Sequence, residues 1–379
     1  MLLFMIQRPF WLSRIQETWK QAPIVWLSGV RRVGKTTLAR SLSEAKYLNC
    51  DLPSSQTLLE DPEAFYRSVA EPIVILDEVH QLADPSRMLK IGADGFPKLK
   101  ILATGSSTLA ATRKFRDTLT GRKRAVHLAP VLFTELKGFG VADLRTRLFH
   151  GGLPQALLTQ SRDPGFYSEW VDSYYARDVQ ELFRVEKRGG FLLLVETLLR
   201  QNGGLLDVTH LANVCRLSRP TIGTYLDVLQ TTHVIHLLRP YHGGGKQELV
   251  RRPKVYAFDT GFVVHAKGWG ELRAEDCGLL WENVVLEHLM ACGDTPSLYY
   301  WRDKQGHEVD FVVPRGRDTC DVLECKWNPD PFDPRNLRAF RATYPKGRNF
   351  VAGPYLHESY TRDVAGVPVT YTGLLDLSL

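Results

Sequence analysis

The sequence predicts an α/β protein whose first 150 residues form a doubly wound parallel sheet. Two observations predict that sheet: short apolar runs typical of buried strands, and amphipathic stretches between them typical of helices. A third observation, the length of 379 residues, indicates two or three domains instead of one. The expected strands of the sheet span residues 24–28, 47–51, 73–77 and 101–105.

The composition is that of an ordinary globular protein. The chain is 44% hydrophobic and 24% charged, so disorder is not expected. A net charge of +6 permits a nucleic-acid partner but does not require one. No apolar run reaches the roughly 18 residues of a membrane span, and the N-terminus lacks a signal-peptide pattern. Because the six cysteines form no C-x-x-C pair, we expect reduced thiols and a cytoplasmic protein. Because no apolar run is long enough to span a membrane, we expect no membrane partner.

The run GVRRVGKT, which directly follows the first expected strand, matches the full G-x-x-x-x-G-K-[ST] pattern of a P-loop. Backbone N–H groups of such a loop, together with the start of the following helix, bind phosphates. Lys35 is expected to contact the β- and γ-phosphates of ATP, and the Thr36 hydroxyl to bind Mg²⁺. The expected nucleotide-binding residues are Gly29, Arg31, Arg32, Val33, Gly34, Lys35, Thr36 and Thr37.

Two carboxylates stand at the end of the apolar run 73–77: Asp77 is its last residue, and Glu78 directly follows it. Asp77 is expected to hold Mg²⁺, directly or through water, and Glu78 to activate the attacking water. The alternative, that Asp77 only caps the next helix, is less favoured because two acids at the carboxyl end of a strand downstream of a P-loop suit an active site.

Two further catalytic candidates follow the strand 101–105. Ser106 is expected to lie between the P-loop strand and the Asp77 strand, where it could contact the γ-phosphate or the attacking water. Arg122 lies in a basic cluster between residues 113 and 124. It could be an arginine finger that stabilises the transferred phosphoryl group, or equally an arginine that faces DNA or a protein partner.

Residues 150–240 show mostly helical periodicity, and within them residues 207–239 have a helix-turn-helix pattern. Asp207 can cap a first helix, VTHLANVC, and Ser218 can cap a second. The strand VIHLL and the glycine-rich turn at 243–245 would supply a wing. DNA contact through the second helix is favoured over protein contact. The expected DNA-facing residues are Arg216, Arg219, Thr221, Thr224 and Tyr225.

The C-terminal segment carries a third constellation, on two expected strands. Strand alternation in EVDFVV places Glu308 and Asp310 on one face, and Glu324 and Lys326 share a face of DVLECKW. If the strands pair, these acids converge with the lysine, and Glu282 on an upstream helix could join them. Asp310, Glu324 and Glu282 would bind Mg²⁺ or Mn²⁺ while Lys326 helps to place a nucleophile. The alternative is a salt-bridged strand face.

The order of these motifs resembles a known family. GVRRVGKT, ILDEVH, TGSS, HGGLP, YYARDV, YAFDTG, WEN, EVDFVV and LECKW follow one another as in bacterial and archaeal AAA+-like ATPases whose C-terminal half is a domain of unknown function of the PD-(D/E)xK nuclease-like kind. The resemblance covers essentially the whole chain. It implies an ATPase domain at 1–150, a helical and winged-helix segment at 151–245, and a restriction-nuclease-like α/β domain at 246–379. It also implies Walker A roles for Lys35 and Thr36, Walker B roles for Asp77 and Glu78, and nuclease-like positions for Glu282, Asp310, Glu324 and Lys326.

The sequence therefore predicts a Mg²⁺-dependent ATPase that engages DNA and carries a nuclease-like domain, with DNA cleavage left open. A second hypothesis is a nucleotide-switched regulator that binds DNA or protein and whose nuclease-like domain is inactive. A third is a remodelling ATPase that acts on protein. An arginine finger supplied by another copy would require a homo-oligomer.

Overall fold

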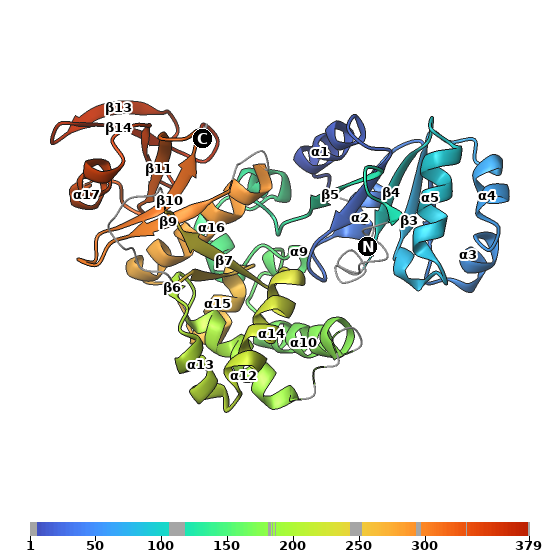
Figure 1. Ribbon diagram of the computed structural model, residues 1–379, viewed down its shortest axis with the longest axis horizontal. Helices are drawn as coiled ribbons and strands as arrows, with labels where there is room; N and C mark the ends of the chain where they lie inside the picture. The colour runs from blue at the N-terminus through green and yellow to red at the C-terminus, as the bar shows by residue number, and fades with distance from the viewer. Residues whose placement is uncertain are drawn as a thin grey trace. The chain divides into compact units, whose positions relative to one another are not determined.

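The computed structural model describes residues 6–105, 118–180, 183, 185, 187–242, 252–292, 297–330 and 332–377 (Figure 1). The chain divides into two compact units. Unit 1 comprises Met1–Ala129, Glu169–Arg184 and Thr231–His233, and unit 2 comprises Pro130–Ser168, Val185–Gln230 and Val234–Leu379. This partition differs from the expected boundaries near 150 and 245, because the chain leaves unit 1 earlier and returns to it for two short segments.

Unit 1 contains a parallel sheet with the strand order β2-β3-β4-β1-β5. The four expected strands are present within two residues of their expected ends, and β4 lies between β1 and β3 as anticipated. The fifth strand was not anticipated, because its sequence KRAVH is mostly polar; it is an edge strand in which only Val126 is fully buried. The strands are β1 (Ile24–Ser28), β2 (Ala45–Asn49), β3 (Ile73–Asp77), β4 (Lys100–Thr104) and β5 (Lys123–His127).

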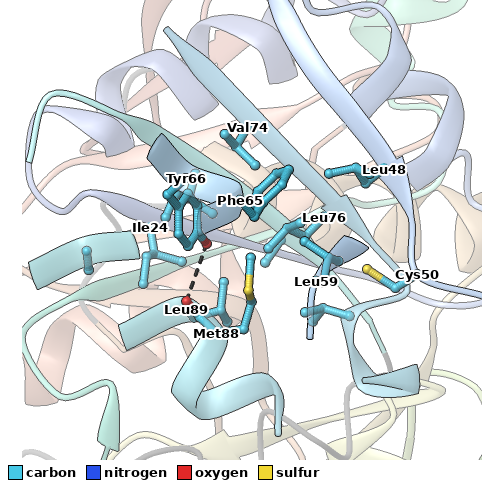
Figure 2. Packing of buried hydrophobic residues seen from close by; sticks show 14 of the residues in the cluster. Ile24, Leu48, Cys50, Leu59, Phe65, Tyr66, Val74, Leu76, Met88 and Leu89 are labelled. Carbon is cyan, nitrogen blue, oxygen red and sulfur yellow. Dashed lines mark hydrogen bonds between the residues drawn. The ribbon is translucent and has the colours of Figure 1, made fainter. Parts of the chain in front are cut away.

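Helices cover both faces of this sheet. Figure 2 shows one face, where alternate strand residues such as Ile24, Val74 and Leu76 pack against Phe65 and Leu89 from two helices. The other face presents the intervening strand residues, and α1 contacts β1 and β5. The helical elements of unit 1 are α1 (Pro9–Trp19), α2 (Lys35–Arg40), α3 (Pro53–Leu58), α4 (Pro62–Ser68), α5 (Pro85–Gly95), the end of α10 (Pro164–Tyr174), and short turns at Val79–Gln81 and Tyr175–Gln180.

Unit 2 contains a mixed sheet with the order β13-β14-β12-β11-β10-β9-β7-β8-β6 in its described part. The expected wing strand (β7) joins the C-terminal strands through β9, so the middle and C-terminal segments form one unit instead of two domains. The strands are β6 (Gly204–Leu205), β7 (Ile235–Pro240), β8 (Lys254–Ala257), β9 (Tyr299–Arg302), β10 (Glu308–Pro314), β11 (Cys320–Cys325), β12 (Asn349–Ala352), β13 (Tyr360–Val364) and β14 (Val367–Thr372).

The helices of unit 2 confirm the helical character of residues 150–240. The expected first helix of the helix-turn-helix pattern is α13, which Asp207 caps by accepting N–H groups of Thr209 and His210. The second helix, α14, follows a left-handed turn at Arg216. The helices are α8 (Leu144–His150), α9 (Pro154–Leu157), α12 (Arg188–Arg200), α13 (Val208–Cys215), α14 (Arg219–Thr231), α15 (Thr260–Lys267), α16 (Ala274–Cys292) and α17 (Arg335–Thr343), with a 3-10 segment at Phe133–Phe139.

A buried ion pair joins three helices of unit 2. Arg147 on α8 is fully buried, and its guanidinium donates to Val131 O (2.8 Å), to the Thr260 hydroxyl on α15 (3.0 Å) and to Glu287 Oε2 on α16 (2.5 Å). Burial raises the pKa of Glu287 to about 7, although Arg147 opposes that shift. The Arg147–Glu287 ion pair therefore connects α8 with α16. Loss of Arg147 would leave the Glu287 carboxylate in the core without an opposite charge.

Replacing Arg147 with Met is expected to lower the free energy of unfolding by about 3–5 kcal/mol, because Glu287 would stay buried without its partner. Chemical denaturation followed by tryptophan fluorescence measures the change. Arg338→Met, at an exposed position of α17 in the same unit, is the matched control and should cost about 0.5 kcal/mol or less. Equal midpoints for the two variants would show that the ion pair does not hold these helices together.

Candidate functional site

The loop between β1 and α2 is shaped to hold phosphates. Gly29 has φ 146°, and a Cβ there would lie 2.6 Å from Leu128 O, so a larger residue would clash with backbone. Gly34 is also left-handed, at φ 102°, and α2 begins at the next residue. The Lys35 ammonium turns back into the loop and donates to Gly29 O (2.8 Å) and Val30 O (3.1 Å). Burial lowers the pKa of Lys35.

The carboxylate of Asp77 is the centre of a hydroxyl cluster at the end of β3. Its Oδ2 accepts from Thr36 Oγ1 (2.8 Å) and from the Tyr47 hydroxyl (2.6 Å), and its Oδ1 accepts from Thr104. Thr36 and Asp77 thus present a hydroxyl and a carboxylate oxygen side by side, the oxygen ligands that Mg²⁺ prefers at a P-loop. The residues fit the ion, and Mg²⁺ held there would neutralise charge on the β- and γ-phosphates.

Sequence reasoning missed Tyr47 and Thr104. Thr104 ends β4, the strand beside β3, and Tyr47 lies on β2, its other neighbour. Polar residues near the carboxyl ends of strands that flank Asp77 were the signal that could have found them, provided that the strand order was known.

Glu78 lies directly beyond the strand in a left-handed backbone conformation (φ 56°), which is uncommon for a residue with a side chain and is concentrated at functional sites. Its N–H donates to Thr104 Oγ1 (3.0 Å), so the same hydroxyl fixes Asp77 and Glu78. Burial raises the pKa of Glu78, while Lys35 and His80 oppose the shift. The position and environment of Glu78 suit a base that takes a proton from water.

Acidic side chains from the segment Glu169–Arg184 engage the outer part of the P-loop. Arg31 lies 3.3 Å from Asp178 Oδ2, and Arg32 lies 2.5 Å from Glu169 Oε1. The Trp170 indole donates to Arg31 O (3.1 Å). These two arginines, expected to bind nucleotide, are therefore paired with acids of unit 1 in this structure. Asp178, which belongs to the motif YYARDV, is a site neighbour that sequence reasoning did not single out.

Two nucleotide-binding candidates, Val33 and Thr37, and the catalytic candidate Ser106 remain. Val33 is fully buried beneath the loop, and Thr37 is exposed in the first turn of α2. Ser106 lies outside the described residues, so its expected contact with the γ-phosphate stays a prediction.

Arg122 does not lie beside its own P-loop. Its carbonyl accepts from the N–H of Ile24, which begins β1, whereas the P-loop follows the other end of that strand. The guanidinium pairs with Asp94 through two contacts of 2.6 and 3.0 Å. In a parallel sheet, all strands begin at one end of the sheet and finish at the opposite end. Arg122 therefore lies at the end opposite the P-loop and cannot be an arginine finger within its own chain. A finger supplied to a second copy stays a prediction.

The DNA-facing candidates divide into exposed and buried residues. Arg216, Arg219 and Thr224 are exposed, and Thr221 is half-buried with its hydroxyl bonded to Ser218. The expectation for Tyr225 is wrong: it is 6% exposed and packs edge-on against Phe191, with ring centroids 5.2 Å apart. It shares the buried face of α14 with Ile222 and Leu229, because positions three and four apart lie on one side of a helix.

The C-terminal acids and lysine converge as expected. β10 and β11 pair antiparallel, with Phe311 opposite Leu323. Lys326 Nζ donates to Glu324 Oε2 (2.7 Å) and lies 4.0 Å from Asp310 Oδ2. Burial, and then the charge of Asp310, raises the pKa of Glu324 to about 8. Burial, and then the charge of Asp310, also raises the pKa of Glu282.

A β-bulge changes the expected alternation of β10. Val309 opposes Trp301 and Val312 opposes Tyr299, so β10 has one residue more than β9 in this stretch. Val309 and Val312 therefore enter the same hydrophobic cluster, where strict alternation would have separated them. Asp310 lies within the bulge, and its Oδ2 accepts the N–H of Cys325 (2.8 Å).

Two residues of β8 extend this cluster in a way that the sequence did not indicate. Lys254 Nζ lies 3.0 Å from Glu282 Oε1 and 2.6 Å from Glu308 Oε1, and the Tyr256 hydroxyl donates to Glu282 Oε1 (2.5 Å). Over the described residues, no group of three or more His, Cys, Asp or Glu side chains is placed to hold a metal ion. The Oε1 atom of Glu282 is thus engaged by two donors of the protein. Among the described residues, the buried Oε1 of Glu324 is a carboxylate oxygen of this cluster without a hydrogen-bond partner.

Comparison with known families supports the assignment of unit 1. Residues 21–137 match a family described as an AAA domain, a range that includes the P-loop, Asp77 and Glu78. This part of the chain is therefore similar to AAA-type ATPase domains, which supports nucleotide binding and hydrolysis. Residues 141–273 and 277–370 match families described as domains of unknown function, DUF8612 and DUF4143.

Two relatives are similar to the chain over nearly all of its residues. An uncharacterized protein of Mycobacterium tuberculosis is 27% identical over 391 residues, covering 98% of this chain and 86% of the relative. An uncharacterized protein of Haemophilus influenzae is 22% identical over 405 residues and covers 97% of both chains. No helix in the described part of the chain has the length and apolar character to span a membrane.

Solved structures resemble the chain only weakly. A Walker-type ATPase of Pyrococcus abyssi has a TM-score of 0.44 at 16% identity, covering 67% of this chain and 94% of that chain. Cdc6p of Pyrobaculum aerophilum has a TM-score of 0.27 at 11% identity, covering 73% and 92%. These scores are too low to carry a statement about function.

Proposed function

We propose that the chain is a Mg²⁺-dependent ATPase that acts on DNA and carries a cation site of nuclease type in unit 2. The observation that carries the ATPase is the arrangement of Thr36 and Asp77, 2.8 Å apart, with Lys35 in the loop and Glu78 beyond the strand. Lys35 binds the β- and γ-phosphates, and Thr36 and Asp77 hold Mg²⁺. Glu78 takes a proton from the attacking water.

The DNA partner is supported by the surface of the helix-turn-helix. Arg216 in the turn and Arg219 at the start of α14 are both exposed, and Thr224 is exposed on the same helix, with its hydroxyl donating to Pro220 O (3.2 Å). In this motif the start of the second helix enters the major groove, and exposed arginines contact phosphates or guanines. The core residues Ile222, Leu226 and Leu229 are buried, which leaves these polar residues for a partner.

Cleavage is supported by the chemistry of the acid–lysine cluster. The buried Oε1 of Glu324 has no hydrogen-bond partner among the described residues, and a buried carboxylate oxygen of that kind suits a cation. Asp310 and Glu324 would bind a divalent ion that polarises a phosphodiester, and Lys326 beside them would orient the nucleophile. The ion would lower the pKa of a bound water.

A gel assay with plasmid and linear DNA tests this proposal in Mg²⁺ or Mn²⁺, with and without ATP. Asp310→Ala is expected to lower cleavage at least about 100-fold, because one of two carboxylate ligands is lost. Asp318→Ala removes an exposed acid from the turn after β10 and should cleave as wild type does. Loss of cleavage in Lys35→Ala would show that ATP gates the reaction.

No cleavage in either metal, with ATP turnover intact, would contradict the nuclease part and favour a second function. That function is a nucleotide-switched regulator that binds DNA or protein through unit 2. The observation that favours it is the pairing of Glu282 with Lys254, which removes one of the three carboxylates expected to bind metal.

A further inference from the structure

Lys254 is a buried lysine inside the acid cluster of unit 2. It is 3% exposed, and its ammonium contacts Glu282 Oε1 (3.0 Å) and Glu308 Oε1 (2.6 Å). Lysine is almost never fully buried unless it is paired, because an ammonium without compensation loses its hydration at a large cost. The strand that carries it, β8, lies within the expected C-terminal domain, and Lys254 lies two residues before the motif YAFDTG, which begins at Tyr256, but the sequence analysis assigned Lys254 no role.

The contacts of Glu282 are fixed by β8. Lys254 and Tyr256 lie two residues apart, so strand alternation places both on one face, and both donate to the same oxygen of Glu282. Glu282, on α16, is thereby held by one positive charge and one hydroxyl. It does not need a metal ion to be compensated.

The ion-pair contacts of the cluster fall into two groups, although the charge of Lys254 also interacts with Asp310. Lys254 compensates Glu282 and Glu308, and Glu308 also receives Arg302 at 3.0 Å. On the other side, Lys326 bonds one oxygen of Glu324 and lies 4.0 Å from Asp310. One lysine thus faces two carboxylates there, and the buried Oε1 of Glu324 lacks a partner among the described residues. Within the described part of the chain, a buried carboxylate oxygen without a hydrogen-bond partner therefore remains on the side of Asp310 and Glu324.

We propose that Lys254 is the resident cation of this site, so that the cluster takes one divalent metal ion at Asp310 and Glu324 instead of two. The inference rests on the cation site of the proposed function and adds a residue and a stoichiometry to it. With Lys254 in place, Glu282 and Glu308 attract no second ion. Without its charge, four acids would face Lys326 and Arg302, and a second divalent ion would enter.

Mn²⁺ titration of the nucleotide-free, full-length protein, read by the electron paramagnetic resonance signal of free Mn²⁺, tests the stoichiometry. Asp310→Ala gives the number of ions bound elsewhere, and wild type is expected to bind one more. Lys254→Gln keeps a hydrogen-bond donor but loses the charge, and it is expected to bind two more. Lys254→Arg keeps the charge and should bind one Mn²⁺ more than Asp310→Ala, as wild type does. Circular dichroism of each variant is needed to exclude misfolding as the cause of a gain, because a misfolded chain can also bind Mn²⁺ through exposed carboxylates.

The double variant Lys254→Gln/Glu282→Gln keeps the test decisive if Lys254→Gln does not fold. It removes one charge of each sign and is expected to keep one Mn²⁺, with an affinity within about 3-fold of wild type. Loss of that Mn²⁺ would show Glu282 to be a metal ligand and would overturn the inference. The inference would also be overturned if folded Lys254→Gln bound the same number of Mn²⁺ ions as wild type. If wild type and Asp310→Ala bind equal numbers, the cation site of the proposed function fails first, whatever Lys254 does.

Discussion

Lys35→Ala is expected to lower the rate of ATP hydrolysis by at least about 10³-fold. The ammonium lies inside the P-loop on the carbonyls of Gly29 and Val30, at the position where the β- and γ-phosphates bind. Its removal takes away the main cation of the loop in a partly water-excluded site, where one preorganised group contributes about 10²- to 10³-fold or more. Steady-state release of phosphate in saturating Mg²⁺–ATP measures the effect.

Lys46→Ala is the matched control for this prediction. Lys46 lies on β2 in the same unit, and its side chain is exposed. The control should hydrolyse ATP at the wild-type rate. If Lys35→Ala turned over ATP as fast as Lys46→Ala does, the assignment of this loop to ATP would be wrong.

Glu78→Gln is expected to separate ATP binding from ATP hydrolysis. The amide cannot take a proton from water, so the turnover rate should fall by about 10²- to 10⁴-fold, the range that a general base contributes. The backbone at Glu78 is fixed by its own N–H bond to Thr104, which the substitution leaves in place. The affinity for Mg²⁺–ATP, measured by titration with a fluorescent ATP analogue, should therefore stay within a few-fold of wild type.

Glu60→Gln, an exposed substitution of the same kind in unit 1, controls for the general effect of removing a charge. It should leave both binding and turnover unchanged. Weak nucleotide binding by Glu78→Gln would contradict the assignment of Glu78 as a base, and would indicate that its carboxylate shapes the loop instead.

The sequence predicted the sheet of unit 1 where local signals were strong. β1 and β3 are apolar on both faces and β1 leads into a complete phosphate-loop motif, so periodicity and motif agree. The order of β4 between β1 and β3 also followed from the expected site. β5 was not predicted from the sequence, because an edge strand can be polar and KRAVH lacks the alternation that marks a strand.

The residues that sequence reasoning missed share one property: their partners are distant in the sequence. Tyr47 meets Asp77 30 positions away, and Lys254 meets Glu282 28 positions away. No local pattern records such contacts, which depend on how strands are ordered in the sheet. Tyr225 is different, because its spacing from Ile222 and Leu229 places it on the buried side of α14, where it packs against Phe191.

The partition into two units shows the same limit. Composition marked a break near residue 245, yet β7 and β8 pair with each other and join β9 in one sheet. Strand pairing across a glycine-rich stretch overrides a boundary drawn from composition, because backbone hydrogen bonds of the sheet edge need partners.

The rate of ATP hydrolysis by the full-length protein, with and without duplex DNA and with and without an unfolded polypeptide, tests the central claim most directly. We expect hydrolysis that requires Mg²⁺, rises on addition of DNA, loses that rise as salt increases, and is absent in Lys35→Ala. Hydrolysis that DNA leaves unchanged at low salt, but that the polypeptide stimulates, would contradict the account and identify a remodelling ATPase that acts on protein.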